Sequence, residues 1–271
     1  MISLRACLVI IALLVCGCAN KLLLYPTTQV ADAGGAQRRV ISLANDRQVE
    51  VFTARSRGAH DSGDPRAFVL EFTGNATRAE YITRYVANRW NKRPVEVWVM
   101  NYPGFGQSTG PATLNAIAPA SLAVYDELAK VAGARPIIIE ASSLGTCVAL
   151  YVATQRPVKA MVLQNPPPLQ RMILQRYGWI VPSVVVAQIP AELNSLDNAA
   201  KVKSPGVILK SGKDRTVWPE YQQMVIDAYA GEKHVMQMPD AGHNSEVRGD
   251  DLERLQHELD WLWSTCGLAL P

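Results

Sequence analysis

Short runs of apolar and β-branched residues alternate along the chain with longer segments of helical periodicity. Eight of these runs are predicted to be strands: Arg39–Leu43, Val49–Ala54, Ala67–Phe72, Val95–Asn101, Pro136–Glu140, Val158–Gln164, Gly206–Lys210 and His234–Met238. Helical periodicity covers the segments Ala76–Trp90, Ile117–Val131, Ser143–Thr154, Pro219–Tyr229 and Asp251–Trp263. The first two strands can form a hairpin. The alternation that follows predicts an α/β fold, a mostly parallel sheet of about eight strands with helices on both faces.

One segment, about residues 165–204, interrupts this alternation because no sheet strand is expected in it. After a proline-rich start it is apolar, with Leu169, Met172, Ile173, Leu174, Tyr177, Trp179, Ile180, Val184, Val185 and Val186. An apolar insertion beside the C-terminal ends of parallel strands predicts a small helical cap that covers a substrate groove and excludes water. Extra core packing or a membrane-facing surface is the alternative.

The N-terminus has the pattern of an export signal. Arg5 precedes the apolar run Leu8–Val15, which is too short to cross the roughly 30 Å core of a bilayer as a helix. Residues 1–17 are therefore predicted to be a signal peptide, followed by a single domain over 18–271. The sequence Val15-Cys16-Gly17-Cys18 resembles the bacterial lipobox, which makes Cys18 the first mature residue and the site of lipidation. An ordinary signal peptide or an uncleaved anchor with incidental cysteines is the alternative.

A lipid on Cys18 would anchor the protein to a membrane of the bacterial cell envelope without a spanning helix. Ala19 provides no inner-membrane retention signal, so the outer membrane is favoured if the cell is Gram-negative. Of the five cysteines, Cys147 and Cys266 would remain in the folded domain, and no essential disulfide is expected between them.

Composition excludes several classes of protein. Apolar residues are 48% and charged residues 19% of the 271, which argues against disorder and against an integral membrane bundle. The net charge of +3, without a long Lys/Arg run or zinc-finger spacing, gives no support for a nucleic-acid partner.

A candidate nucleophile follows the strand Pro136–Glu140, in the sequence Ala141-Ser142-Ser143-Leu144-Gly145. A serine exposed on a tight strand-to-helix turn needs small residues two positions before and two positions after it. Ser143 meets this condition with Ala141 and Gly145. Ser142 does not, because Glu140 and Leu144 would flank it.

In folds that place a serine on such a turn, an acid follows a late strand and a histidine follows the last strand. Asp214 ends the turn Ser211-Gly212-Lys213-Asp214 that follows the strand Gly206–Lys210, and His243 lies on the loop that follows the strand His234–Met238. These positions predict that Ser143, His243 and Asp214 form a catalytic triad.

The other candidates fit less well. His60 precedes the serine in the chain, His234 begins a strand, and His257 lies off the apolar stripe of its helix. Asp240 is too close to His243 along the same loop and has the composition of a turn residue.

The turn Thr73-Gly74-Asn75-Ala76 follows the strand Ala67–Phe72 and precedes a helix. The Asn75 amide, with the Leu144 amide, is predicted to form an oxyanion hole. A plain strand-to-helix turn is the alternative.

No cofactor or metal is predicted. The glycine-rich segment 101–110 lacks the acidic residue that a dinucleotide site requires, and Asp214 stands where a phosphate loop needs serine or threonine. No His-Glu-x-x-His motif or Cys/His cluster is present.

These motifs resemble the α/β-hydrolase superfamily, in particular a subgroup with His-Gly-Asn-Ala before the first helix and Tyr-x-Gly-Tyr-Gly-x-Ser-x-Gly on the next loop. The matching segments are Thr73–Ala76 and Tyr102–Gly110, and the resemblance extends over about residues 23–263. Thr73 stands where the subgroup has histidine, and Ala141 where it has glycine. The resemblance implies the α/β-hydrolase fold.

The triad and the resemblance predict a serine hydrolase that cleaves a carboxylic ester or related acyl bond through an acyl-enzyme. The apolar cap and the lipid anchor favour an acyl or lipid-like small-molecule substrate. The alternatives are a serine peptidase or thioesterase of the same fold, and a non-catalytic envelope protein that binds lipid or a partner.

Overall fold

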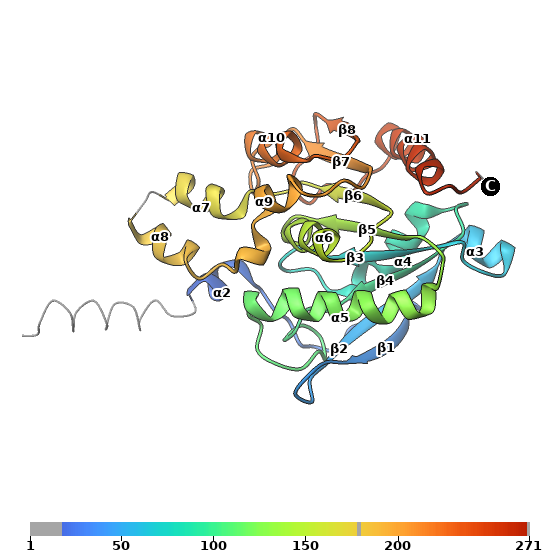
Figure 1. Cartoon of the computed structure of the whole chain (residues 1–271), viewed down its shortest axis with the longest axis horizontal. Coiled ribbons are helices and arrows are strands. Elements are labelled where there is room, and N and C mark those ends of the chain that lie inside the picture. The colour runs from blue at the N-terminus through green and yellow to red at the C-terminus, as the bar shows by residue number, and fades with distance from the viewer. Residues whose placement is uncertain (1–17, 178–179, 270–271) are drawn as a thin grey trace, which may run out of the picture.

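The computed structural model describes residues 18–177 and 180–269 (Figure 1). The eight strands are β1 (Gln37–Ser42), β2 (Gln48–Arg55), β3 (Ala67–Phe72), β4 (Val95–Met100), β5 (Ile137–Ser142), β6 (Ala160–Gln164), β7 (Gly206–Ser211) and β8 (Lys233–Met238). They form one sheet in the order β1-β2-β4-β3-β5-β6-β7-β8. The predicted strands are confirmed, with ends that differ by one or two residues.

The sheet is antiparallel only at one edge. β1 pairs antiparallel with β2, β2 pairs antiparallel with β4, and all the other neighbours are parallel. The parallel strands are mostly buried on both faces, which explains their nearly continuous apolar sequences.

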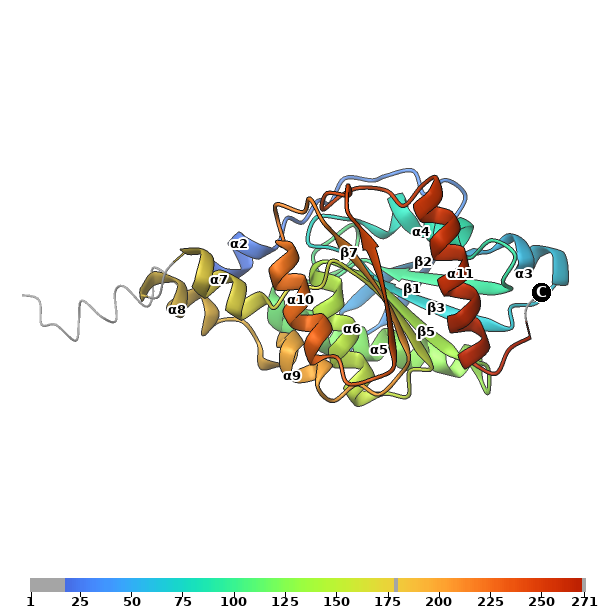
Figure 2. The same ribbon diagram turned by 90° about the horizontal axis from the view of Figure 1, so that it is seen from above.

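Helices cover both faces of the sheet (Figure 2). The helices outside the β6–β7 connection are α2 (Cys18–Leu23), α3 (Arg57–Ser62), α4 (Ala79–Trp90), α5 (Leu114–Ala132), α6 (Leu144–Gln155), α10 (Pro219–Ala228) and α11 (Asp250–Thr265). Apolar residues of α5, α6 and α10 belong to one core cluster, and those of α4 and α11 belong to a second. Trp90 of α4 and Trp263 of α11 join the helices of the second face, with ring centroids 6.5 Å apart. Among these helices, α2 and α3 were not predicted.

The connection between β6 and β7 contains α7 (Leu169–Tyr177), α8 (Ile180–Val186), a 3₁₀ turn (Ala191–Leu193) and α9 (Ser195–Ala199). Its described residues form no strand, and α7 and α8 project from the body of the molecule at the end where α2 lies (Figure 1). The fold is thus the α/β-hydrolase fold with a small helical cap, as predicted.

The predicted signal peptide, residues 1–17, lies outside the described residues. Within the part of the chain that is described, no helix combines the length and the apolar character needed to cross a membrane.

Candidate active site

Ser143 occupies a sharp turn between β5 and α6. Its backbone has φ 50° and ψ −123°, a conformation that an L-residue adopts only when the surrounding structure enforces it. A Cβ on Gly145 would lie 2.0 Å from the carbonyl oxygen of Phe72, so this position admits only glycine. Ala141 is buried, and its methyl group is accommodated. The structure therefore has small residues two positions before and two positions after Ser143, as the sequence analysis required of the nucleophile.

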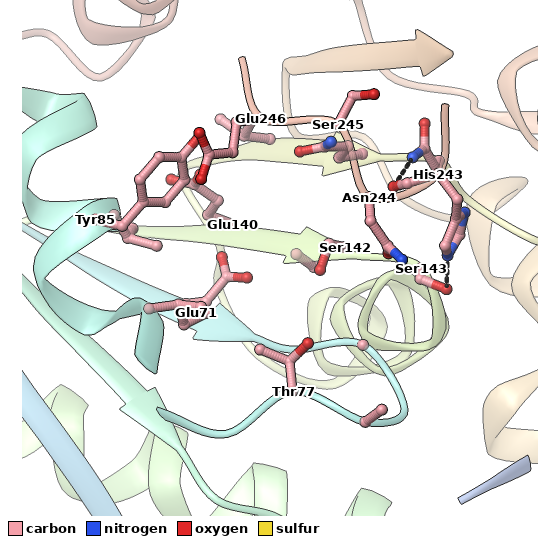
Figure 3. Close-up of a pocket in the computed structure, with 18 of the residues that line it drawn as sticks. Glu71, Thr77, Tyr85, Glu140, Ser142, Ser143, His243, Asn244, Ser245 and Glu246 are labelled. Atoms are coloured by element: carbon pink, nitrogen blue, oxygen red, sulfur yellow. Dashed lines mark hydrogen bonds between the residues drawn. The ribbon is translucent and has the colours of Figure 1, made fainter. Parts of the chain in front are cut away.

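His243 lies on the loop between β8 and α11 and contacts both of its predicted partners. Its Nε2 lies 3.0 Å from the Ser143 Oγ, and its Nδ1 lies 2.7 Å from the Asp214 Oδ2 (Figure 3 shows the contact with Ser143). The Asp214 side chain is fully buried and that of His243 is 14% exposed. Three residues from distant parts of the chain thus form one continuous chain of hydrogen bonds.

The Asp214 carboxylate is held from several sides. Its Oδ1 accepts hydrogen bonds from the amides of Thr216 (2.8 Å) and Val217 (2.9 Å). Its Oδ2 also accepts from the Gln222 side chain at 3.2 Å. Gln222 was not singled out in the sequence. Gln222 lies on the inward face of α10, where a buried residue is usually apolar, and its side-chain amide is fully buried. A glutamine at such a position could have been recognised as a functional candidate.

Asn165 supports the histidine loop. It follows β6, has φ 53°, and donates a hydrogen bond from its Nδ2 to the His243 carbonyl oxygen at 3.0 Å. This position was not singled out in the sequence analysis. A buried asparagine with left-handed backbone that bonds a distant loop can be recognised only in three dimensions.

The loop from β3 to α4 passes close to Ser143. A Cβ on Gly74 would lie 3.6 Å from the Ser143 Cβ, and Asn75 lines the same pocket as Ser143. The Tyr102 hydroxyl donates to the Thr73 carbonyl oxygen at 2.9 Å. Thr73 donates from its own hydroxyl to the carbonyl oxygen of Thr77 at 3.1 Å. Both bonds hold the loop beside the serine.

The other predicted oxyanion residue, Leu144, is the first residue of α6. The amides of the first helical turn have no acceptor within the helix, so the Leu144 amide is a suitable donor for an oxyanion.

A pocket of about 510 Å³ opens beside Ser143 and His243 (Figure 3). Its walls come from β3, β5, β6, α4 and the loop that carries His243. Its inner end is charged, with Glu71 on β3, Glu140 on β5 and Arg89 on α4.

In the segment predicted as the cap, about residues 165–204, the first residue, Asn165, lines this pocket. None of the described residues between 166 and 204 lines it. Leu169, Ile173 and Val185 instead pack into the core cluster of the α5 and α6 face, whereas the pocket lies on the α4 face. That the cap covers a substrate groove stays a prediction.

Comparison with known proteins agrees with this architecture. The family model described as the alpha/beta hydrolase fold matches residues 81–262, which is more than half of the chain. The chain belongs to the α/β-hydrolase family.

Among its relatives, this α/β hydrolase is 28% identical to the uncharacterized protein Rv2307c of Mycobacterium tuberculosis over 193 residues, 68% of this chain. The match covers 66% of the mycobacterial protein, so the chain spans slightly less than two thirds of that relative's length.

Two solved esterases share the fold at low sequence identity. The Pyrococcus furiosus esterase Pf2001 has a TM-score of 0.67 and 15% identity, covering 89% of this chain and 97% of that one. Est1E from Butyrivibrio proteoclasticus, solved with ferulic acid, has a TM-score of 0.69 and 16% identity, covering 84% of this chain and 99% of that one.

The competing candidates of the α/β hydrolase lie elsewhere. His60 and His257 are exposed, and Asp240 forms an exposed ion pair with Lys213. His234 stacks on Trp261 with ring centroids 3.7 Å apart and bonds Glu258 at 2.7 Å.

Cys147 and Cys266 are free, buried thiols. Burial raises the pKa of the Cys147 thiol to about 12 and that of Cys266 to about 11, which makes both of them unreactive at neutral pH. Across residues 18–177 and 180–269, no group of three or more His, Cys, Asp or Glu side chains is arranged to hold a metal ion.

Proposed function

We propose that the protein is a serine hydrolase that cleaves a carboxylic ester or related acyl bond through an acyl-enzyme. The observation that carries the proposal is the hydrogen-bond chain from the Ser143 Oγ through the His243 ring to the buried Asp214 carboxylate. This arrangement of nucleophile, base and orienting carboxylate is what acyl transfer requires.

In the proposed mechanism, His243 Nε2 takes the proton of Ser143 as the hydroxyl oxygen attacks the carbonyl carbon. Asp214 keeps the His243 Nδ1–H in place and stabilises the imidazolium that forms. The amides of Asn75 and Leu144 donate to the oxyanion of the tetrahedral intermediate. His243 then protonates the leaving group, and water hydrolyses the acyl-enzyme by the same route in reverse.

Fluorophosphonate labelling tests the proposal. The wild-type protein should be labelled at Ser143 and should hydrolyse short p-nitrophenyl esters. Ser143→Ala should abolish labelling and reduce kcat by something on the order of a million-fold, because the nucleophile is removed.

Ser142→Ala is the matched control, because Ser142 is the neighbouring hydroxyl in the same pocket. It should keep both labelling and turnover. Labelling that survives Ser143→Ala, or no labelling of the folded wild-type protein, would contradict the proposal and favour a non-catalytic binding protein. Labelling at Ser143 with turnover of amides or thioesters but not of oxygen esters would favour a peptidase or thioesterase.

A lipid anchor at Cys18 in the bacterial envelope is part of the proposal. Residue 18 begins α2, which contacts α8 of the cap. Ala19 and Leu24 are buried in the main core cluster. The domain would therefore sit against the membrane with α8 nearby. Metabolic labelling with radioactive palmitate should mark the wild-type protein and not Cys18→Ser, and equal labelling of both would contradict the anchor.

A further inference from the structure

The inner end of the pocket holds two adjacent carboxylates. Glu71 on β3 and Glu140 on β5 are direct partners in the parallel register of these strands. Residues paired in this way point to the same face of the sheet. Both side chains therefore face α4, and Figure 3 shows both carboxylates directed into the pocket.

The two carboxylates differ in their partners. Glu140 accepts a hydrogen bond from Arg89 and a second one from the Trp90 Nε1 at 2.8 Å. Glu71 is only 3% exposed, and its Oε2 has no hydrogen-bond partner among the described residues. A buried carboxylate oxygen without a donor is destabilising, and a bound group that supplies the donor is one physical reason for such an atom to persist in a native fold.

The inner end of the pocket has more acidic than basic side chains. Two carboxyl groups, those of Glu71 and Glu140, face one guanidinium group, that of Arg89. Burial raises the pKa of Glu71 well above its usual value, and the neighbouring Glu140 raises it further, whereas Arg89 lowers it. Arg89 donates to Glu140, and the Glu71 Oε2 and the Arg89 Nε are both left without a partner among the described residues. A cation beside Glu71 would favour its charged form and supply the missing donor, against the effect of burial and of Glu140.

We propose that the inner end of the pocket binds a primary ammonium group of the substrate, held by the carboxylates of Glu71 and Glu140. The inference rests on the proposed function, and it specifies the substrate of that same site. An ammonium group has three donors and one positive charge, which suits two adjacent carboxylate groups.

The distance defines the size of such a substrate. Glu140 precedes Ser142, the last residue of β5 before the nucleophile turn, by two residues, which is about 7 Å along the strand at 3.3 Å per residue. A chain of a few methylene groups therefore separates the bond that is cleaved from the ammonium group. A long aliphatic chain would place apolar carbons against Glu71 and Arg89, and is disfavoured in this part of the site.

The test is calorimetric binding of hexylammonium and of the neutral hexanol to the full-length protein. The wild-type protein should bind hexylammonium at least about tenfold more tightly than hexanol, because a hydrogen-bonded charge pair is formed only with the ammonium. Glu71→Gln should lose about tenfold in affinity for hexylammonium and should bind hexanol unchanged.

Glu246→Gln is the matched control, because it removes the same charge from a side chain at the rim that is 65% exposed. Its affinity for hexylammonium should change less than twofold. Equal binding of the two ligands by the wild-type protein would overturn the proposal, and so would a loss in Glu246→Gln as large as that in Glu71→Gln. The wild-type comparison decides the proposal even if Glu71→Gln does not fold.

Binding requires no turnover, so this experiment separates the two proposals. Tight ammonium binding without labelling of Ser143 would contradict the hydrolase and keep the ammonium site. Ester turnover without ammonium preference would keep the hydrolase and remove the ammonium site.

Discussion

The two ends of helix α4 each hold a buried cluster of charges, and only one of them opens into the pocket. At the N-terminal end, both Glu80 oxygens accept hydrogen bonds from Arg78, and one also accepts from Asn101 at 2.8 Å. None of these three residues lines the pocket. At the C-terminal end, Arg89 and Glu140 are paired, but Glu71 beside them keeps an oxygen without a donor.

The cluster at the N-terminal end of α4 has a structural role, whereas we propose that the cluster at the C-terminal end binds a ligand. The first cluster is closed, since its charges satisfy one another and Asn101 also accepts a hydrogen bond from the Ala79 amide at 2.9 Å. It therefore holds the start of α4 against the end of β4. The second cluster is incomplete without a further group, and the pocket gives such a group access. Both agree with the helix dipole, with Glu80 in the first turn and Arg89 in the last.

Breaking the closed cluster should have the largest effect. Arg78→Met leaves Glu80 buried without its cation, and we expect the free energy of unfolding to fall by about 3 to 5 kcal/mol. Urea denaturation followed by circular dichroism measures this. Arg84→Met, an exposed arginine of the same helix, is the control and should change stability by less than about 0.5 kcal/mol. Equal losses in the two variants would show that the cluster has no structural role.

Breaking the incomplete cluster should have a smaller effect. Arg89→Met leaves Glu140 with its bond from Trp90, and the pocket admits water, so we expect a loss near the lower end of the range, about 3 kcal/mol at neutral pH. Adding Glu140→Gln to this variant should restore part of the loss, because it removes the charge that had lost its partner. No recovery in the double variant would mean that Arg89 acts by packing alone.

The smallest effects should have opposite dependence on pH. Burial acts to raise the pKa of Glu80, but the bonds from Arg78 and Asn101 outweigh it and the pKa is lowered. Its stabilisation is therefore present above the pKa of an unfolded glutamate and is lost as pH falls through the folded value. Glu80→Gln should lose about 2 kcal/mol at neutral pH, and less in acid.

For Glu71 the sign is reversed, because its folded pKa is raised. The folded state becomes less stable as pH rises from the unfolded pKa through the folded one. Glu71→Gln should therefore gain stability relative to the wild-type protein as pH rises through this range. Urea denaturation at several pH values tests both variants, and parallel pH profiles would refute the distinction between the clusters.

Much of the fold was predictable because its signals are local. Each strand from β3 to β8 is a short apolar run, and the long helices α4, α5 and α11 follow their apolar periodicity. The short helices α2 and α3 were missed because six residues are too few to show a period. Ser143 was selected by the size of its neighbours, and the backbone contact at Gly145 is the physical reason.

The sequence by itself determined the order of the elements and the three residues that follow β5, β7 and β8, because periodicity and steric size act between neighbours in the chain. Only the tertiary structure decided that β3 lies beside β5, which brings Glu71 next to Glu140, and that Asn165 and Gln222 hold His243 and Asp214 in place. These contacts depend on strand order and loop packing between distant segments. Glu71 and Glu140 are both buried and line the same end of the pocket, and the sequence of neither strand reveals this.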